Sequence, residues 1–310
     1  MTTILIAEKI DSICADLFRD AGFEVLVRPG LAPEELRAAI AECEGIVVRS
    51  SVKVTAELLA AAGRLKVVGR AGAGVDTIDV EAARARGIAV LNTPGQNAGA
   101  VAELVLGLML CLARRICQAH GALAAGRWEK NSLSAFGTEL GGKTLGLIGF
   151  GAVGRKVVPL ARGFGMEVLA HDPEVADEAI VAAGARPAGL AEIYAAADYL
   201  SLHLPMNKGT RNLISREVIF ERLKPGAMLI NCARGGLVDE AALAEALTAG
   251  RLAGAGLDVF ESEPPPADHP LLTLENVVLT PHLGASTAEA QVNVARSIAV
   301  QMIEHFKKVA

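Results

Sequence analysis

Three side chains suited to proton transfer and anion binding follow apolar runs of the sequence. Arg234, Glu263 and His282 each come shortly after a run that is typical of a buried strand. Ligands of open parallel sheets bind beyond the carboxyl ends of the strands, so we expect all three side chains at one rim. This combination is suited to removing a hydride from the α-carbon of a small hydroxy acid while a proton leaves its hydroxyl.

Each of the three side chains has a predicted role. His282 is the predicted acid–base group, because histidine is the side chain that ordinarily titrates near neutral pH. Glu263 is predicted to stabilise the imidazolium and to hold one ring tautomer. Arg234 is predicted to clamp the substrate carboxylate and to polarise the reacting carbonyl. Any one of these residues is equally compatible with a structural hydrogen bond, so the prediction depends on their joint occurrence.

A glycine fingerprint lies in the middle of the chain. Residues 149–154 read Gly-Phe-Gly-Ala-Val-Gly, after a predicted strand over 143–148 and before a predicted helix over 153–164. Such glycines permit a tight turn, backbone approach to a pyrophosphate and close packing of helix on strand, and the helix N-terminus attracts phosphate charge. We expect this helix to bury an apolar face formed by Val153, Val157, Leu160, Ala161 and Phe164.

An acidic residue stands where a dinucleotide's ribose would be bound. Asp172 ends the next predicted strand, residues 166–171, and lies 23 residues after Gly149. This spacing is typical of the carboxylate that accepts hydrogen bonds from both ribose hydroxyls. The same charge repels a 2′-phosphate, and residues 173–175 contain no arginine to hold one. The sequence therefore predicts NAD, and not NADP, as the cofactor.

Alternating strand-like and helix-like stretches predict an α/β protein with parallel sheets. They begin before the fingerprint, with predicted strands at residues 4–7, 24–27, 45–48, 66–69 and 89–91, and resume after it at 199–203, 227–231, 254–258 and 277–280. We therefore predict two doubly wound domains, with a Rossmann NAD domain (98–283) inserted into a flavodoxin-like substrate domain (1–97 and 284–310). One long helix over 97–125 is expected to bridge them, and a terminal helix over 287–307 to cover the first domain.

Composition limits the other function classes. The 310 residues are 52% hydrophobic and 21% charged, the net charge is −5 and no basic run occurs, so non-specific nucleic-acid binding is not expected. Residues 98–113 are apolar, but Glu103 interrupts them and they are too short to span a membrane. No leader peptide is recognisable. Five scattered cysteines predict no disulfide framework or metal site and fit a cytoplasmic location.

The combined motifs resemble those of the D-2-hydroxyacid dehydrogenases. The resemblance covers nearly the whole chain and is carried by residues 68–76, 136–140, 147–154, 231–240, 257–260 and 281–287. Membership of that family implies the catalytic trio above, the ribose-binding Asp172, a nicotinamide contact at Asp258, and a homodimer made through the nucleotide domains, or a homotetramer. Residues 126–142, which contain the sole tryptophan, Trp128, are interpreted as an arm that packs on another subunit or as a surface loop with a buried indole.

The resemblance also implies further contacts to the cofactor and the substrate. The predicted cofactor contacts are Ala73, Gly149, Gly151, Ala152, Val153, Asp172, Leu204, Pro205, Cys232, Ala233, Arg234, Asp258, His282, Gly284 and Ala285. The predicted substrate contacts are Arg49, Ser50, Arg70, Gly72, Gly74, Arg234 and His282, with Lys53 close to them. Two positions depart from the family pattern: Leu204 replaces a common threonine, and Ala73 differs inside the Arg70 loop.

Within the family, the chain most resembles the branch that oxidises D-3-phosphoglycerate for serine biosynthesis. Arg49 and Arg70 fit a phosphorylated acid, although Arg49 and Lys53 are also explained as solvated surface charges. The rival within the family is a hydroxypyruvate or glyoxylate reductase, which needs no phosphate pocket. A more distant alternative is a corepressor-like protein that senses NAD(H). Because the sequence stops at Ala310, feedback through an appended regulatory domain is not expected.

Overall fold

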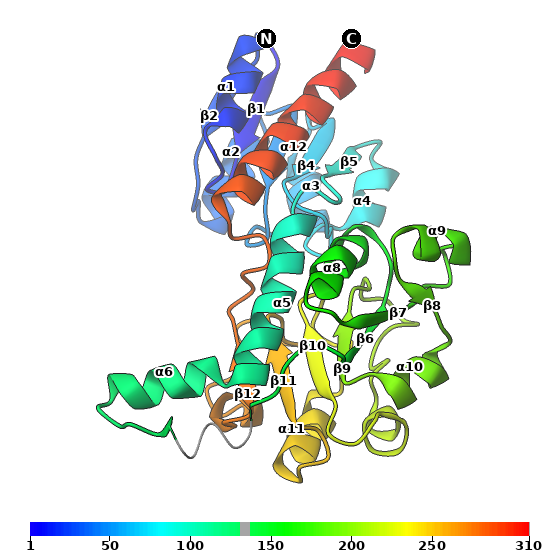
Figure 1. Cartoon of the computed structure of the whole chain (residues 1–310). Coiled ribbons are helices and arrows are strands. Elements are labelled where there is room, and N and C mark those ends of the chain that lie inside the picture. Colours follow the sequence, from blue (N-terminus) through cyan, green and yellow to red (C-terminus); the bar gives the residue numbers. More distant parts are fainter. Residues whose placement is uncertain (131–136, 310) are drawn as a thin grey trace. The chain divides into compact units, whose positions relative to one another are not determined.

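The chain forms two compact units, each described here by itself. The structure, a computed structural model, describes residues 1–130 and 137–309. One unit comprises Met1–Asn97 and Ala285–Ala310, and the other comprises Ala98–Gly284 (Figure 1). We call them unit 1 and unit 2. Unit 2 is thus inserted into the chain of unit 1.

Unit 1 is built on a five-stranded parallel sheet in the order β2-β1-β3-β4-β5. The strands are β1 (Thr3–Ile6), β2 (Glu24–Val27), β3 (Gly45–Val48), β4 (Val67–Arg70) and β5 (Ala89–Asn92). The helices of this unit are α1 (Ile13–Asp20), α2 (Pro33–Ile40), α3 (Ala56–Ala61), α4 (Val80–Ala85) and α12 (Ala288–Val309). This strand order is that of a flavodoxin-like fold, as the sequence predicts.

Both faces of the unit 1 sheet are buried, which explains why its strands are continuous apolar runs. Along β1, Leu5 faces one apolar core, whereas Ile4 and Ile6 face the other. The second core is completed by α12, which packs on α1, β4 and β5 and contributes Met302. The terminal helix therefore covers the first sheet, as expected from its lack of a strand of its own.

Unit 2 is built on a seven-stranded parallel sheet in the order β12-β11-β10-β9-β6-β7-β8. The strands are β6 (Thr144–Ile148), β7 (Glu167–His171), β8 (Arg186–Pro187), β9 (Tyr199–Leu202), β10 (Met228–Asn231), β11 (Gly254–Leu257) and β12 (Val277–Leu279). The order reverses between β6 and β9, which gives the switch point of a Rossmann fold beside the glycine-rich turn. The helical segments are α5 (Ala98–Arg114), α6 (Ile116–Ala124), α8 (Ala152–Gly163), α9 (Asp177–Ala182), α10 (Leu190–Ala196), η1 (Val218–Arg222), α11 (Glu240–Thr248) and η2 (Pro270–Thr273).

The expected single helix over 97–125 is wrong, because the chain breaks it at one residue. Arg115 adopts a left-handed backbone conformation, with φ of 52°, and separates α5 from α6. A left-handed residue cannot continue a right-handed helix, so the chain changes direction there. Helix periodicity did not reveal this break, since Arg115 is a good helix former.

The expected apolar face of the helix after the fingerprint is also partly wrong. Val157 and Ala161 are buried, but Leu160 and Phe164 are 37% and 46% exposed. The buried stripe of α8 instead includes Gly154 and Val158. The helix is therefore rotated from the expected orientation, because the glycine allows that side of it to lie against the strand.

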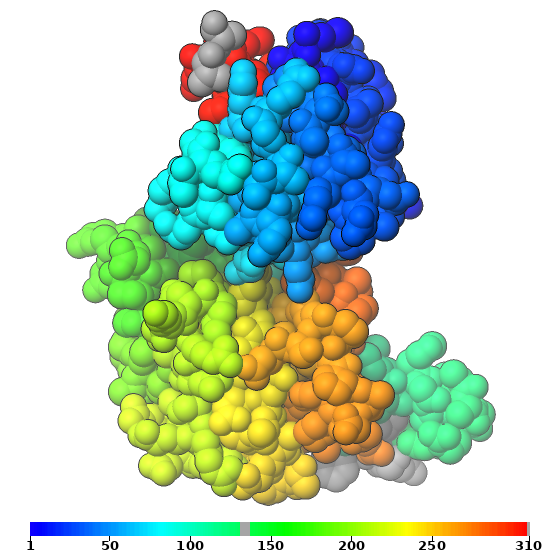
Figure 2. Space-filling model, turned by 180° about the vertical axis from the view of Figure 1, so that it is seen from behind, coloured from blue at the N-terminus to red at the C-terminus, as the bar shows by residue number. Residues whose placement is uncertain are grey.

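Helix α6 stands out from the surface of unit 2 and leads into residues 125–130 (Figures 1 and 2). Three large apolar side chains on this segment are solvent-exposed: Ile116 (48%), Leu123 (59%) and Trp128 (79%). The interpretation of Trp128 as a buried indole is therefore wrong. Residues 131–136 of the predicted arm lie outside the described residues. In the described part of the chain, no helix is both long and apolar enough to cross a membrane.

Candidate active site

The glycine-rich turn joins β6 to α8 at the carboxyl edge of the unit 2 sheet. Gly149 has a φ of 95°, and a Cβ there would lie 2.4 Å from the carbonyl oxygen of His203. Only glycine fits this turn, because the backbone of His203, the residue after β9, lies directly against it. Gly151 is the N-cap of α8 and has no side-chain cap, and a Cβ at Gly151 would meet nothing within 4 Å. The first turn of α8, which includes Ala152 and Val153, is therefore open to an anion at its N-terminus.

Asp172 lies beside this turn, directly after β7. Its Oδ2 accepts a hydrogen bond from the Phe150 N–H at 2.7 Å, and its Oδ1 accepts one from the Glu174 N–H at 3.0 Å. These bonds fix the carboxylate against the glycine loop. The arrangement fits the predicted ribose acceptor, with the remaining lone pairs of the carboxylate available to hydroxyl groups.

His203, Leu204 and Pro205 follow β9, on the other side of the glycine-rich turn. Burial lowers the pKa of His203 from 6.5 to about 4, so this ring is neutral at pH 7. Its Nε2 lies 3.0 Å from the Ser201 hydroxyl. The Leu204 side chain lies against Gly149, so this position offers an apolar group and no hydroxyl.

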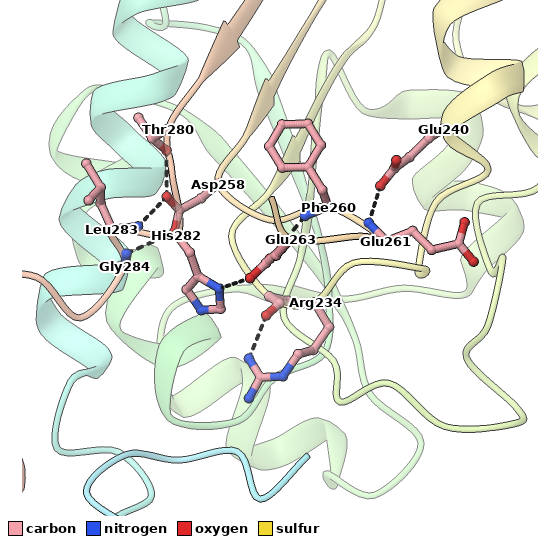
Figure 3. A network of polar contacts seen from close by, with 11 residues as sticks. Arg234, Glu240, Asp258, Phe260, Glu261, Glu263, Thr280, His282, Leu283 and Gly284 are labelled. Carbon is pink, nitrogen blue, oxygen red and sulfur yellow. Dashed lines mark hydrogen bonds and ion pairs between the residues drawn. The ribbon is translucent and has the colours of Figure 1, made fainter. Parts of the chain in front are cut away.

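Arg234 is presented by a loop that Asn231 holds at the end of β10. The buried Asn231 side chain accepts a hydrogen bond from the Ala233 N–H at 3.1 Å and donates one to the Arg234 carbonyl at 2.9 Å. The Arg234 guanidinium donates to the Ala233 carbonyl at 2.6 Å (Figure 3). Cys232 is buried in this loop, and burial raises the pKa of its thiol. This thiol is therefore a packing group and not a nucleophile.

Glu263 and His282 form a hydrogen-bonded pair in the loops after β11 and β12. Nδ1 of His282 lies 2.7 Å from Oε2 of Glu263, and Oε1 of Glu263 accepts a hydrogen bond from the Phe260 N–H at 3.2 Å. Because a carboxylate only accepts, Nδ1 carries the proton and Nε2 is left as an acceptor. Nε2 points away from Glu263 (Figure 3). This is the arrangement that a general base at Nε2 requires.

Asp258 accepts hydrogen bonds from residues that precede and follow His282 in the chain. The Asp258 carboxylate accepts hydrogen bonds from the Thr280 hydroxyl at 2.6 Å and from the backbone N–H groups of Leu283 and Gly284 at 2.6 and 2.8 Å. His282 itself has a φ of 55°, in the left-handed region that disfavours a side chain. The buried Asp258 therefore holds His282 in a conformation that costs about 1–3 kcal/mol.

The Arg234, Glu263 and His282 loops belong to one edge of one sheet. Strands β10, β11 and β12 are adjacent and parallel, and each of the three loops follows the carboxyl end of one of them. A largely apolar cavity of about 380 Å³ adjoins the Glu263–His282 pair, lined on its other sides by Phe260, Leu272 and prolines 264, 265 and 281. The chemistry available here is proton transfer at His282 beside a guanidinium.

The predicted substrate loops of unit 1 follow the adjacent parallel strands β3 and β4. The loop after β3, with Arg49 and Ser50, is fixed by the Glu8 carboxylate, which accepts hydrogen bonds from the N–H groups of residues 49, 51 and 52. The Arg49 guanidinium donates to the Lys9 carbonyl at 3.1 Å.

The loop after β4 contains Arg70, Gly72, Ala73 and Gly74. Arg70 donates to the Ala71 carbonyl at 2.8 Å. The Gly72 N–H already donates to the Arg70 carbonyl, so it is engaged within the turn. Asn92 donates to the Ala73 carbonyl at 2.6 Å. Ala285 begins the returning segment of unit 1, where its carbonyl accepts a hydrogen bond from Gln291 at 2.6 Å.

Sequence reasoning missed several residues that shape these loops: Glu8, Asn231, Glu240, His269 and Thr280. For Asn231, a polar residue that ends an apolar run was an available signal, because a buried amide requires partners. Glu8 also directly follows an apolar run. Glu240 lies in the 231–240 motif, but its role was missed, as was that of His269, because their bonding partners are distant in sequence.

Comparison with known proteins identifies the family of the chain. The sequence profile described as "D-isomer specific 2-hydroxyacid dehydrogenase, NAD binding domain" matches residues 106–284. The D-3-phosphoglycerate dehydrogenase of Homo sapiens is 44% identical over 304 residues, which are 98% of this chain and 56% of that protein. The chain thus spans little more than half the length of such relatives.

Two further proteins are similar to this chain over most of their own length, one in sequence and one in structure. The hydroxypyruvate reductase of Thermotoga maritima is 46% identical over 280 residues, which cover 90% of this chain and 88% of that protein. The NAD⁺-bound 3-phosphoglycerate dehydrogenase of Entamoeba histolytica has a similar structure, with a TM-score of 0.83 at 29% identity. That similarity covers 100% of this chain and 96% of the other.

Proposed function

Because the chain belongs to the D-isomer specific 2-hydroxyacid dehydrogenase family, we propose that it oxidises D-3-phosphoglycerate to 3-phosphohydroxypyruvate with NAD. This oxidation is proposed to serve serine biosynthesis. The observation that carries the proposal is the Glu263–His282 pair at 2.7 Å, set on the sheet edge that also presents Arg234.

The proposed acid–base step takes place at Nε2 of His282. This atom accepts the proton of the C2 hydroxyl as the C2–H bond breaks and the C2–O bond becomes a carbonyl. Glu263 keeps Nδ1 protonated and stabilises the imidazolium that forms. In the reverse direction, the imidazolium returns the proton to the oxygen. NAD, when bound, supplies the acceptor of the C2 hydride.

The residues around the glycine-rich turn fit a dinucleotide. Gly151 leaves the N-terminus of α8 open, and Asp172 presents a fixed carboxylate next to that turn. The pyrophosphate would lie against the first and the ribose hydroxyls against the second. Ala152 and Val153, Leu204 and Pro205, and Cys232 to Arg234 are proposed as the surrounding contacts. Asp258, Gly284 and Ala285 are proposed on the nicotinamide side, and Ala73 from unit 1.

Arg234 is the proposed clamp for the substrate carboxylate. Its planar fork can bind two carboxylate oxygens, and its charge favours the developing carbonyl dipole. The Asn231 side chain fixes the backbone of the loop that presents this guanidinium. Arg234 is thus proposed to contribute to both substrate binding and turnover.

The phosphate is proposed to bind the basic side chains of unit 1. Arg49 and Arg70 follow adjacent strands, and the Arg49 loop is fixed by Glu8. Ser50, Gly72 and Gly74 lie in the same two loops. The naming of several relatives as D-3-phosphoglycerate dehydrogenases, at 44–46% identity, supports a phosphorylated substrate.

Hydroxypyruvate reduction is the second candidate. The Thermotoga maritima hydroxypyruvate reductase matches this chain over 88% of its own length, whereas the human relative is matched over 56%. Reduction of an unphosphorylated acid would use the same His282, Glu263 and Arg234. It would not use a phosphate-binding Arg49.

Steady-state kinetics with paired acids separate the two candidates. We expect kcat/KM with NAD to be at least tenfold higher for D-3-phosphoglycerate than for D-glycerate. Arg49→Gln should lower the first value and leave the second unchanged, whereas Arg19→Gln, on the surface of α1, should change neither. A tenfold preference for glycerate would overturn the substrate assignment. No turnover of any D-hydroxy acid despite tight NADH binding would instead support an NAD(H)-sensing protein.

A homodimer and a cytoplasmic location are also part of the proposal. The exposed apolar side chains of α6 and Trp128 support a contact between the NAD-binding units of two copies. A tetramer would need an additional interface. All five cysteines are free thiols, which suits a reducing compartment.

A further inference from the structure

The peptide that joins Phe260 to Glu261 lies where several segments of unit 2 meet. This peptide lies between β11 and the predicted catalytic Glu263. It contacts the Arg234 loop on one side and the start of α11 on another (Figure 3). It is therefore the part of the backbone that ties the Glu263 loop to the rest of the site.

A hydrogen-bonded pair of largely covered side chains, Glu240 and His269, holds this peptide from the side of α11. Glu240, the first residue of α11, accepts a hydrogen bond at Oε1 from the Glu261 N–H at 2.7 Å. Its Oε2 lies 3.0 Å from Nε2 of His269. The side chains of Glu240 and His269 are only 12% and 15% exposed. Both carboxylate oxygens are thus engaged inside the protein, as a buried carboxylate requires.

Gly235 and the ring of His269 pack directly against other sides of this peptide and of Phe260. A Cβ on Gly235 would lie 1.8 Å from the Phe260 carbonyl oxygen, so the residue after Arg234 lies against this peptide. The ring of His269 packs edge to face on Phe260, with 5.9 Å between the centroids. The peptide therefore has no room to shift toward the Arg234 loop, and His269 holds it through two contacts.

The Phe260–Glu261 peptide is connected in turn to the proposed catalytic pair, Glu263 and His282. The Phe260 N–H donates to Oε1 of Glu263, and Oε2 of Glu263 accepts from His282. The Glu263 and His282 side chains are 38% and 47% exposed. Holding two solvent-exposed side chains in one geometry costs side-chain entropy, so a fixed Phe260 N–H is needed to keep the Glu263 carboxylate aligned on His282.

We propose that Glu240 and His269 are positioning residues that align the Glu263 carboxylate on His282 through the Phe260–Glu261 peptide. Neither touches the reacting atoms. The inference rests on the roles proposed above for Glu263 and His282. Loss of the pair would misalign a proton acceptor, and small misplacements at reacting centres have large rate effects.

Glu240→Gln is the informative variant. Its amide oxygen can still accept from the Glu261 N–H, but its NH₂ group then faces Nε2 of His269. The imidazole must move its proton to Nδ1, which is buried without a hydrogen-bond partner in the described part of the chain. Glu245→Gln is the matched control, because Glu245 lies on the same helix and pairs with the exposed Arg216.

The test is a double-mutant cycle with Glu263→Gln, read in kcat, substrate KM and NADH affinity. We expect Glu240→Gln to lower kcat about tenfold, with KM and the NADH Kd within twofold of wild type. In the Glu263→Gln background the same change should lower kcat less than twofold, because its effect passes through Glu263. Glu245→Gln should leave kcat unchanged in both backgrounds.

The alternative outcomes are distinguishable. An equal loss from Glu240→Gln in both backgrounds, or unchanged kcat, would overturn the positioning role and leave the catalytic assignment intact. No effect of Glu263→Gln alone would overturn the proposed catalytic pair. If Glu240→Gln does not fold, His269→Phe keeps a ring on Phe260 and removes only the bond to Glu240. It is then tested in the same cycle, with the same non-additivity expected.

Discussion

At the level of residues, the proposed proton transfer depends on which nitrogen of His282 carries a proton. The bond to Glu263 places that proton on Nδ1, and the hydrogen bonds of Asp258 hold the left-handed backbone of His282. The sequence predicted Arg234, Glu263 and His282 because each follows an apolar run. It did not predict the supporting bonds, because Asp258 bonds to Thr280 and Gly284 across more than 20 residues.

Arg234→Ala should damage substrate binding and turnover together. Loss of the fork removes charge-assisted hydrogen bonds from both the bound acid and the transition state, so kcat/KM should fall about a hundredfold, with higher KM and lower kcat. Steady-state kinetics at saturating NAD measure both quantities. Arg216→Ala, at an exposed pair on the same unit, is the control. A rise in KM with unchanged kcat would show that Arg234 binds the substrate and the transition state equally.

Asp172→Ala should relax the preference for NAD. Removing the carboxylate removes two ribose hydrogen bonds and the repulsion of a 2′-phosphate, so the ratio of kcat/KM for NAD to that for NADP should fall at least tenfold. The neighbouring exposed Glu174→Ala should leave the ratio unchanged. An unaltered ratio in Asp172→Ala would place the ribose contact elsewhere.

At the level of elements, the turns and loops after the strands of unit 2 determine the site. Periodicity predicted most strands to within a residue or two, because parallel strands buried on both faces form apolar runs. It missed the two-residue β8 (Arg186–Pro187), which has no such run. It also missed the break at Arg115, which is a backbone conformation without a residue-type signal.

His203 should make the stability of unit 2 depend on pH. Its pKa is lowered to about 4 by burial, so below pH 6.5 the unfolded chain binds a proton that the folded chain does not. Its contribution is fully present above pH 6.5 and is lost as the pH falls toward 4, amounting to about 2 kcal/mol between neutral pH and about pH 5.

Urea unfolding at these two pH values measures the effect. His203→Gln has no titrating group at this position and keeps a hydrogen-bonding side chain near Ser201. Its free energy of unfolding should therefore fall less than that of the wild type on acidification. The same pH dependence in both proteins would show that His203 is not held neutral by burial.

At the level of the whole molecule, the chain folds as two parallel-sheet units, one inserted into the other in sequence. The sequence predicted the fold class of both units, because the glycine fingerprint lies in the middle of the chain and strands alternate with helices on both sides of it. The periodicity of apolar residues did not predict which part of the surface would contact a second copy of the chain. The position of Trp128 became interpretable only when its 79% exposure was observed.

The proposed homodimer should depend on the exposed apolar side chains of α6 and the residues after it. Leu123→Ser combined with Trp128→Ser should raise the dimer dissociation constant at least tenfold, since large apolar side chains contribute most to such contacts. Sedimentation equilibrium measures this constant. Val181→Ser removes an equally exposed apolar side chain from α9 and should have no effect. A monomeric wild type would contradict the dimer.

The most direct test of the account is the single-turnover rate of NADH formation by His282→Gln in the presence of saturating NAD and D-3-phosphoglycerate. If Nε2 of His282 accepts the hydroxyl proton, this rate should fall at least a hundredfold while NAD affinity stays within twofold of wild type. A rate within threefold of wild type would contradict the assignment of His282 as the general base.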